Sequence, residues 1–371
     1  MKKTLRKRKN PSLAGDGSYL LRTARTLEAS RPDVAAMTAA AEEAAQRLAS
    51  GGRLWATGPR PLVCEIMSRA GGFMMLRQLA KTPAKPGDVV LHFPEPKASL
   101  PRQADKAFVI TLGGSSGPGH GFAHRAEAGD VSPTLATVIL SWLFTGELIA
   151  ALTRLGKMPV LYQSIGMYDG FPRIHRYKSG EIAFHGDKRV PPAAAGVLGR
   201  RYIDAVTGML RRVEKEERRN LDRAGAWARE ARAAGKRLFM YSMGHLFPDE
   251  IGETAIGRVF RSAVWHAGFI HFAKPDHVYR SGDLAVHIGY QHPPDELLQR
   301  ARPAGARVVY VSLRADRDSA RDPGVIRIDP MWDWPDACVP IEGYDVPALP
   351  ASAVVNAAIA WEIYRLQALR G

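Results

Sequence analysis

The stretch GDVVLH at residues 87–92 occurs a second time, as GDLAVH, at residues 282–287. Each copy is a short apolar run behind a Gly-Asp pair, which is typical of a turn that leads into a buried parallel strand. Both runs end in histidine. A strand repeated so far apart in the chain indicates an internal duplication.

The segments around the two stretches follow one order. In the first half, the expected elements are a helix at 32–50, a strand at 53–57, a helix at 62–67, the strand at 87–92, a strand at 107–111 and a helix at 132–155. In the second half, they are a helix at 202–234, a strand at 236–242, a helix at 248–262, the strand at 282–287, a strand at 307–312 and a helix at 351–369. Because parallel strands need crossover connections, this alternation predicts two tandem three-layer α/β/α sandwiches with parallel sheets.

The length of 371 residues also favours two domains over one. The expected division is a basic tail and lead-in at 1–30, a first domain at 31–165, a linker at 166–199 and a second domain at 200–371. The linker is rich in Gly and Pro, and its residues 177–182 are expected to form a hairpin. It is either a plain connector or a lid over a site.

The composition is that of a globular chain, with 46% apolar and 24% charged residues and a net charge of +15. Six of the basic residues lie in the first ten positions. This tail is either a solubilising extension or an arm that contacts nucleic acid or another polyanion. The remaining positive charge suits a protein whose ligands are anionic.

Nothing in the sequence is typical of export or of a membrane span. The basic N-terminus is followed by PSLAGDGS, where a secretory signal would have an apolar run. The longest apolar stretch, 138–152, is shorter than a bilayer requires. Cys64 and Cys338 lie in apolar segments, which favours reduced thiols over a disulfide. We therefore expect a cytoplasmic protein.

A helix before an α/β unit that a long helix closes, occurring twice, resembles the SIS (sugar isomerase) family. The paired arrangement is similar to the isomerase half of glucosamine-6-phosphate synthase. The most specific residues are Glu65 with the Arg-Ala-Gly-Gly run at 69–72, and the pair Gly244-His245 followed by Glu250. The resemblance covers about residues 30–165 and 200–370. It implies a sugar or sugar-phosphate ligand and a homodimer.

The resemblance also implies aldose–ketose isomerisation, in which a base moves a proton between adjacent carbons through an enediol. Glu250, just after the strand at 236–242, is the expected base, and His245 is the expected acid for opening the sugar ring. Glu65 is the corresponding residue of the first copy. His266 is a second acid candidate if the helix at 248–262 turns back over the site. Each of these residues also has a structural interpretation, as a solvated helix-start carboxylate or a hydrogen-bonding histidine.

The Gly-rich loop at 113–121 is the best candidate for holding an anion, through Ser115, Ser116 and Gly117. Thr57, Ser242 and Gly244 follow or end the first strand of each copy and are further substrate-binding candidates. The hydroxyl-rich phosphate loop of the resembled family has no counterpart after residue 92 or residue 287.

No cofactor is expected, because the Gly-rich loop lacks the Gly-Lys-Ser/Thr ending of a nucleotide-binding P-loop. No metal is expected either, because His287 and His292 have no Cys or carboxylate at matching spacing. Two functions therefore stay open. One is a sugar or phosphosugar isomerase, and the other is a non-catalytic sugar-phosphate-binding regulatory protein.

Overall fold

The computed structural model describes most of the chain. The described residues are 17–95, 99–114, 119–124, 130–184, 190–242, 254–262, 264–267, 270–273, 278–315 and 322–369. The basic tail therefore lies outside them.

The first half contains a five-stranded sheet in the order β2-β1-β3-β4-β5, and all of its pairs are parallel. Its strands are β1 (Leu54–Thr57), β2 (Arg77–Gln78), β3 (Val89–His92), β4 (Phe108–Leu112) and β5 (His120–Phe122). The second half contains a parallel sheet in the order β7-β6-β10-β11-β12. Its strands are β6 (Leu238–Ser242), β7 (Arg261–Ser262), β10 (Leu284–Ile288), β11 (Arg307–Val311) and β12 (Val325–Ile328).

The two sheets correspond strand for strand. Leu54 at the start of β1 pairs with Val89, and Leu238 at the start of β6 pairs with Leu284. The repeated Gly-Asp strands are thus the middle strands of their sheets, each next to the first long strand of its copy. The predicted duplication and the predicted fold class, two tandem α/β/α sandwiches with parallel sheets, are confirmed.

The helices and two small hairpins complete the chain. The helices are α1 (Tyr19–Ala29), α2 (Asp33–Ala49), α3 (Arg60–Ile66), η1 (Arg102–Ala104), α4 (Pro133–Arg154), α5 (Gly170–Lys178), α6 (Val197–Glu216), α7 (Arg218–Ala233), α9 (Ile256–Val259), α10 (Asp295–Ala301) and α11 (Ser352–Ala368). Two antiparallel pairs lie outside the main sheets: β8 (Val264–Ala267) with β9 (Ile270–Ala273), and β13 (Ala337–Val339) with β14 (Ala348–Pro350).

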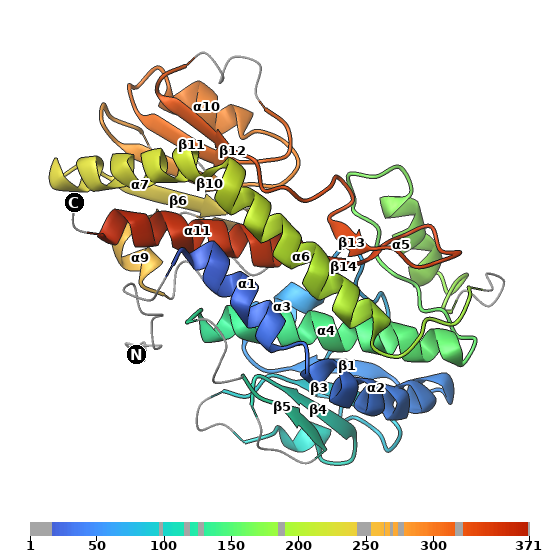
Figure 1. The fold of residues 1–371 in the computed structure, drawn as a ribbon. Helices are drawn as coiled ribbons and strands as arrows, with labels where there is room; N and C mark the ends of the chain where they lie inside the picture. The colour runs from blue at the N-terminus through green and yellow to red at the C-terminus, as the bar shows by residue number, and fades with distance from the viewer. Residues whose placement is uncertain are drawn as a thin grey trace.

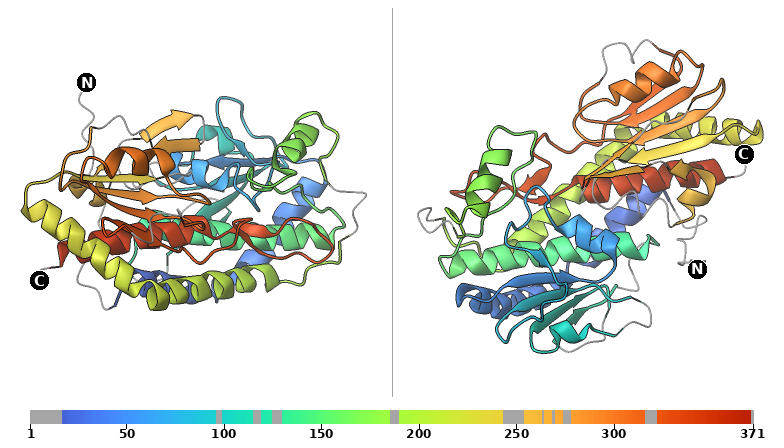
Figure 2. Two further views of the ribbon diagram at one scale, coloured as in Figure 1. Left: turned by 90° about the horizontal axis from the view of Figure 1, so that it is seen from above. Right: turned by 180° about the vertical axis from the view of Figure 1, so that it is seen from behind.

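The two copies share their central helices. In Figure 1 the sheets lie at opposite ends of the molecule, with α1, α4, α6 and α11 between them, and the view from behind in Figure 2 agrees. Helix α1 of the first copy packs on α6 and α11 of the second, while α6 packs on α4. The ring of Tyr19 stacks on Trp361 with centroids 5.5 Å apart, and the Tyr19 N–H donates to Glu362 at 2.7 Å. One hydrophobic core therefore runs through both copies.

A buried carboxylate stabilises this packing between helices of the two copies. Glu147, inside α4, accepts hydrogen bonds from the backbone N–H groups of Gly196 at 2.7 Å and Gly199 at 3.0 Å. These groups belong to the start of α6, where a helix has unpaired donors and a positive dipole end. Gly199 allows this close approach, because a Cβ would lie 3.0 Å from the Glu147 carboxylate and 3.3 Å from Val34, and these side chains would have to shift.

The repeated Gly-Asp pairs have a structural role. Gly87 and Gly282 adopt positive φ values of +96° and +84°, which glycine tolerates best. Asp88 accepts from the backbone N–H groups of Arg53 and Lys85, both at 2.9 Å. Asp283 makes the equivalent bonds in the second copy. Although burial opposes ionisation, these donors lower the pKa of both carboxyl groups. The pairs thus anchor the amino ends of the strands.

Three local predictions were wrong. Residues 177–182 do not form a hairpin, since Tyr177 and Lys178 end α5 and Gly180, at φ +81°, follows the helix in the left-handed conformation. The single helix expected at 202–234 is two helices that meet at Glu217. The described part of the helix expected at 248–262 contains only the four-residue α9, followed by β7.

Helix α4 is a core helix. It is 22 residues long, which is longer than the apolar stretch at 138–152. By length and composition alone it is long and apolar enough to span a membrane. Its apolar window is completely buried by the rest of the protein. Such burial on all sides is typical of the central helix of a folded domain.

Candidate functional site

The carboxyl ends of the first sheet bring three polar side chains into one row. Parallel α/β sheets bind their ligands at this edge. Thr57 pairs with His92, and His92 pairs with Thr111, in the register of β1, β3 and β4. Paired residues of neighbouring strands point to the same face of a sheet. The predicted substrate-binding residue Thr57 therefore lies beside a histidine and a second threonine.

Two members of this row have unsatisfied polar atoms. His92 is 6% exposed and Thr111 is 1% exposed. Neither His92 Nδ1 nor Thr111 Oγ1 has a hydrogen-bond partner among the described residues. Burial lowers the pKa of His92, so its imidazole is neutral at physiological pH. Buried polar atoms without partners are rare in folded proteins, and a polar ligand is one way to satisfy them.

The loops after these strands approach one another closely. A Cβ on Gly58, after β1, would lie 2.3 Å from the Phe93 carbonyl oxygen, and one on Gly114 would lie 2.8 Å from Pro94. His124, after β5, contacts Thr137 of α4 through its Nε2 atom at 2.9 Å. The sequence analysis did not single out His124, because no regular spacing connects it to the strand ends.

The second sheet has a related but less polar row. Tyr241, His287 and Tyr310 pair in register across β6, β10 and β11. The hydroxyl groups of Tyr241 and Tyr279 are 2.7 Å apart and hydrogen-bonded. His287 Nδ1 has no partner among the described residues, as in the first copy. The repeat of an unpartnered histidine at one place in both sheets was not predicted.

Ser242 ends β6 on the opposite face from this row, because it is the residue after Tyr241. It is 1% exposed, and its Oγ atom has no hydrogen-bond partner in the described part of the chain. Ser242 therefore resembles Thr111 in burial. Its place at the end of β6, two residues before Gly244 in the sequence, agrees with the strand-end position expected for it.

Glu65 lies in a buried ionic network that joins the two copies. Its carboxylate is fully buried, 3.4 Å from Arg69 Nε. Arg69 also contacts Asp336 at 3.1 Å and donates to the Ser352 hydroxyl. Tyr290, after β10, donates its hydroxyl to the same Asp336 carboxylate. Glu65 thus holds an arginine of the Arg-Ala-Gly-Gly run, which is a structural task.

The network keeps Arg69 charged. Burial alone would lower the pKa of Arg69, but the Glu65 and Asp336 carboxylates raise it above its ordinary value. Gly71 belongs to the same junction, because a Cβ there would lie 2.5 Å from the Leu349 backbone nitrogen. The conformation is left-handed as well, with φ +74°. The Arg-Ala-Gly-Gly run therefore joins the first copy to β14 and α11 of the second.

Several predicted residues lie outside the described part of the chain. These are Gly244, His245 and Glu250 in one segment and Ser115, Ser116 and Gly117 in another. Their roles stay predictions. The backbone of His266 lies in β8, opposite His271 of β9, and not after a helix that turns back over the site. In the described residues no group of three or more His, Cys, Asp or Glu side chains is placed to hold a metal ion.

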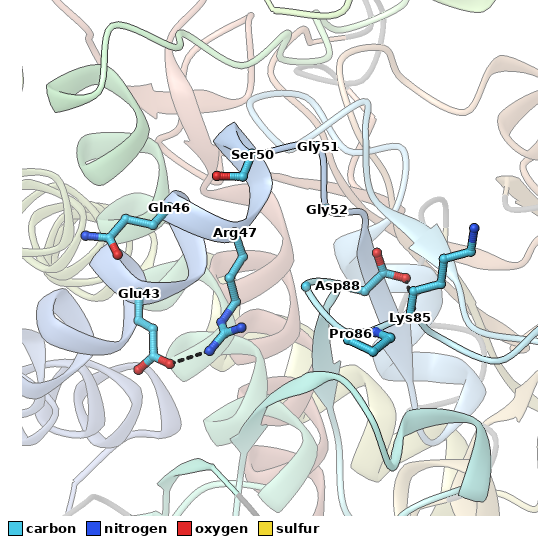
Figure 3. Close-up of a pocket in the computed structure, with 10 residues that line it drawn as sticks. Glu43, Gln46, Arg47, Ser50, Gly51, Gly52, Lys85, Pro86 and Asp88 are labelled. Carbon is cyan, nitrogen blue, oxygen red and sulfur yellow. Dashed lines mark hydrogen bonds and ion pairs between the residues drawn. The ribbon is translucent and has the colours of Figure 1, made fainter.

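A depression of about 730 Å³ lies at the other edge of the first sheet (Figure 3). Its lining comes from the end of α2 and the loop before β3: Glu43, Gln46, Arg47, Ser50, Gly51, Gly52, Lys85, Pro86, Gly87 and Asp88. Glu43 pairs with Arg47 at 2.7 Å, and Asp88 is engaged by the backbone. Because this is the amino edge of the strands, we do not place the ligand there.

Comparison with known sequences finds a relative that matches part of the chain. No protein-family model matches this sequence. A protein of Streptomyces griseus subsp. griseus, described as "UPF0309 protein", is 27% identical over 197 residues, which is 44% of this chain and 78% of that protein.

Two solved structures are similar along nearly the whole chain. The C-terminal domain of glucosamine-fructose-6-phosphate aminotransferase from Francisella tularensis has a TM-score of 0.47 at 11% identity, with 96% of this chain and 97% of that chain covered. The tagatose-6-phosphate ketose/aldose isomerase of Escherichia coli has a TM-score of 0.44 at 12% identity, with 97% and 94% covered. Likenesses at this level do not determine a function. The SIS-like description of the fold depends on the sheet order and the duplication.

Replacing His287 by glutamine is expected to reduce the acid sensitivity of the fold. Burial lowers the pKa of His287 from 6.5 to about 4. Between these values the unfolded chain binds a proton that the folded chain does not, so stability is full above pH 6.5 and falls as the pH decreases toward 4. From pH 7 to pH 5 the wild type should lose ~2 kcal/mol more unfolding free energy than His287→Gln, measured by urea unfolding.

The matched control is His175→Gln on α5, where the histidine is exposed. It should keep the pH slope of the wild type. Equal slopes for the wild type and His287→Gln would show that this histidine is not the buried neutral group described.

Proposed function

We propose that the chain binds a sugar or sugar phosphate at the carboxyl edges of its sheets and isomerises it between aldose and ketose forms through an enediol. The observation that supports a polar ligand is a set of buried atoms at these edges that have no hydrogen-bond partner among the described residues: His92 Nδ1 and Thr111 Oγ1 in one copy, Ser242 Oγ and His287 Nδ1 in the other. A sugar carries many hydroxyl groups that both donate and accept hydrogen bonds. It is therefore suited to satisfy such atoms.

The roles in this proposal follow the order of the chain. Glu250 is the base and His245 the acid, in the segment that leaves the carboxyl end of β6. Ser242 and Gly244 contact the ligand from the same strand end, and Thr57 does so from the first copy. Ser115, Ser116 and Gly117 are proposed for the anionic end of the ligand. His266 is given no role as an acid, because its backbone lies in β8 and not after a helix that turns back over the site. Glu65 is engaged with Arg69, so we do not give it the role of a free base.

A regulatory protein that binds a sugar phosphate without turning it over is the second candidate. The ionic engagement of Glu65 favours it, because the first-copy counterpart of the proposed base Glu250 is paired with Arg69. We also propose a cytoplasmic homodimer, as the resemblance to SIS proteins implies. Light scattering on the purified protein would determine the oligomeric state.

Hydrogen exchange separates the two candidates. The protein would be incubated in heavy water with aldose and ketose sugar phosphates that raise its melting temperature, since a ligand that binds only the folded state stabilises it. An isomerase should exchange the hydrogen at C1 or C2 of the sugar within hours, as read by proton NMR. Binding without any exchange would reject the isomerase and support the regulatory protein.

Thr111→Val is expected to weaken ligand binding while stabilising the free protein. Valine keeps the shape of threonine and removes the hydroxyl, which is buried and unpartnered. Removing this group should raise the unfolding free energy by ~1 kcal/mol, while the loss of one hydrogen bond should lower sugar affinity by roughly fivefold to tenfold. Urea unfolding and calorimetric titration measure the two effects.

Thr207→Val is the matched control. The Thr207 hydroxyl is also buried and unpartnered among the described residues, but it lies within α6 and away from the strand ends. This variant should show a similar stabilisation with unchanged affinity. Equal affinities for Thr111→Val and the wild type would remove Thr111 from the proposed site.

A further inference from the structure

An exposed arginine and an exposed histidine meet at one tryptophan on the carboxyl edge of the second sheet. Arg314 follows β11, His292 follows β10, and Trp334 follows β12. The guanidinium carbon of Arg314 lies 4.4 Å from the Trp334 ring centroid, and the His292 ring meets the same indole edge-on with centroids 5.2 Å apart. Arg314 and His292 are exposed, while Trp334 is half-buried.

The side chain of Arg314 lies over an aromatic ring. Among the described residues its side chain makes neither a hydrogen bond nor an ion pair, and its one recorded contact is the Trp334 ring. An arginine stacked on an aromatic face keeps the N–H groups in its plane free to donate. By contrast, the neighbouring Arg327 is engaged with Asp329 at 2.7 Å. Within the described part of the chain, Arg314 is thus a cation of this edge without an acidic partner.

Backbone contacts hold the three loops together. The Gln291 side chain donates to the Trp334 carbonyl at 2.7 Å, and the Arg314 N–H donates to the Gln291 carbonyl at 3.1 Å. Arg327 donates to the carbonyl groups of Ser312 and Leu313, which fixes the turn before Arg314. Gln291 is 5% exposed. The spacing of the three loops is therefore set by partly buried hydrogen bonds within the protein.

The two copies can be compared here along the sequence. Val89 pairs with Phe108 and Leu284 pairs with Arg307, so β4 and β11 have corresponding registers. Arg314 lies seven residues after Arg307 in the sequence, as Ser115 of the Gly-rich loop lies seven residues after Phe108.

We propose that Arg314, His292 and Trp334 form a binding site for the phosphate group of a phosphate monoester. The guanidinium fork takes two phosphate oxygens, and a third remains for the imidazole. A carboxylate has only two oxygens in one plane, which the fork alone would satisfy. The site rests on the proposed function and deepens it, because it assigns residues to the phosphate group of a sugar phosphate at the carboxyl edge of the second sheet.

The proposal is tested by calorimetric titration of the full chain with inorganic phosphate, at constant ionic strength, against acetate. Arg314→Gln should weaken phosphate binding by roughly tenfold or more, and Arg314→Lys by less, because lysine keeps the charge without the fork. His292→Gln should weaken it by roughly threefold to tenfold. Acetate should bind at least tenfold more weakly than phosphate to the wild type.

Two control variants bracket the effect. Arg223 is also an exposed arginine over a tryptophan ring, 5.4 Å from the Trp227 centroid on α7, so Arg223→Gln should keep the phosphate affinity of the wild type. Asp333 is an exposed acid next to Trp334, and Asp333→Asn should tighten phosphate binding. Equal losses for the Arg314 and Arg223 variants, or equal affinities for phosphate and acetate, would overturn the proposal.

A measurement on the wild type does not depend on any variant folding. Phenylglyoxal modifies free arginine side chains, and peptide mapping by mass spectrometry gives the extent at each site. Phosphate should slow the modification of Arg314 severalfold and leave that of Arg223 unchanged. Phosphate protection without any sugar exchange would reject the isomerase and keep this site. If a sugar without a phosphate group bound as well as its phosphate ester, and phosphate did not protect Arg314, the phosphate site would be rejected and the sugar-binding proposal would be kept.

Discussion

Replacing Arg69 by methionine is expected to destabilise the protein by about 3–5 kcal/mol, the usual cost of removing one partner of a buried ion pair. Arg69 is 4% exposed and lies between the carboxylates of Glu65 and Asp336. Methionine fills much of the space but leaves these two acids without a counter-ion. Their negative charges would then repel each other in a site from which water is excluded. Urea unfolding at pH 7 measures the loss.

The matched control is Arg300→Met on α10, where an exposed arginine pairs with Glu296 at 2.8 Å. This pair is solvated, so the change should cost less than about 0.5 kcal/mol. Adding Glu65→Gln to the Arg69 variant should recover part of the loss, because it removes one of the uncompensated charges. If Arg69→Met unfolded at the urea concentration of the wild type, the network would not be the junction that holds the copies together.

The sequence predicted the sheets well, for a physical reason. GDVVLH and GDLAVH each contain a turn followed by a buried strand. The Gly-Asp pair favours the turn and the apolar residues favour the buried strand, so both parts of the pattern predict the same local structure. Asp88 and Asp283 bond to backbone groups a few residues away or on the neighbouring strand. Such contacts recur wherever the local pattern recurs. The duplication could therefore be predicted from the order of the segments alone.

The packing of helices of one copy on helices of the other could not be predicted in this way. The apolar faces of α1 and α6 indicate that each helix packs against another element, but they do not indicate which copy supplies that element. That choice depends on contacts far apart in sequence, such as Tyr19 with Glu362. The prediction of a hairpin at 177–182 was wrong for a different reason. Gly180 suits a hairpin turn and a helix end equally well, and the residues before it were short of the apolar spacing that would favour a helix.

The candidate site shows the same division. Thr57 could be placed at a strand end because it follows an apolar run, and the register then brings it beside His92. Glu65 was matched to a base by its position in the copy, but its engagement with Arg69 and Asp336 depends on the second half of the chain. Arg314, His292 and Trp334 come from three separate loops that only the folded sheet brings together.

Replacing Glu250 by glutamine is expected to reduce isomerase turnover by about two to four orders of magnitude, with ligand binding nearly intact. Glutamine keeps the size and hydrogen bonding of the side chain and removes the base that moves the proton. The motivation is the Gly-His pair and the glutamate that follow directly after β6, the strand that ends in Ser242. Initial rates with a sugar phosphate, and its dissociation constant by calorimetry, measure both parts.

Glu253→Gln is the matched control, since it makes the same chemical change three residues further along the chain and should leave turnover within about twofold of the wild type. His245→Asn should impair cyclic substrates more than open-chain analogues, because only cyclic sugars need an acid to open the ring. Because Glu250 is the group proposed to remove the proton from C1 or C2, Glu250→Gln should also abolish exchange at these carbons in heavy water. Exchange at the wild-type rate in this variant would mean that another group takes the proton.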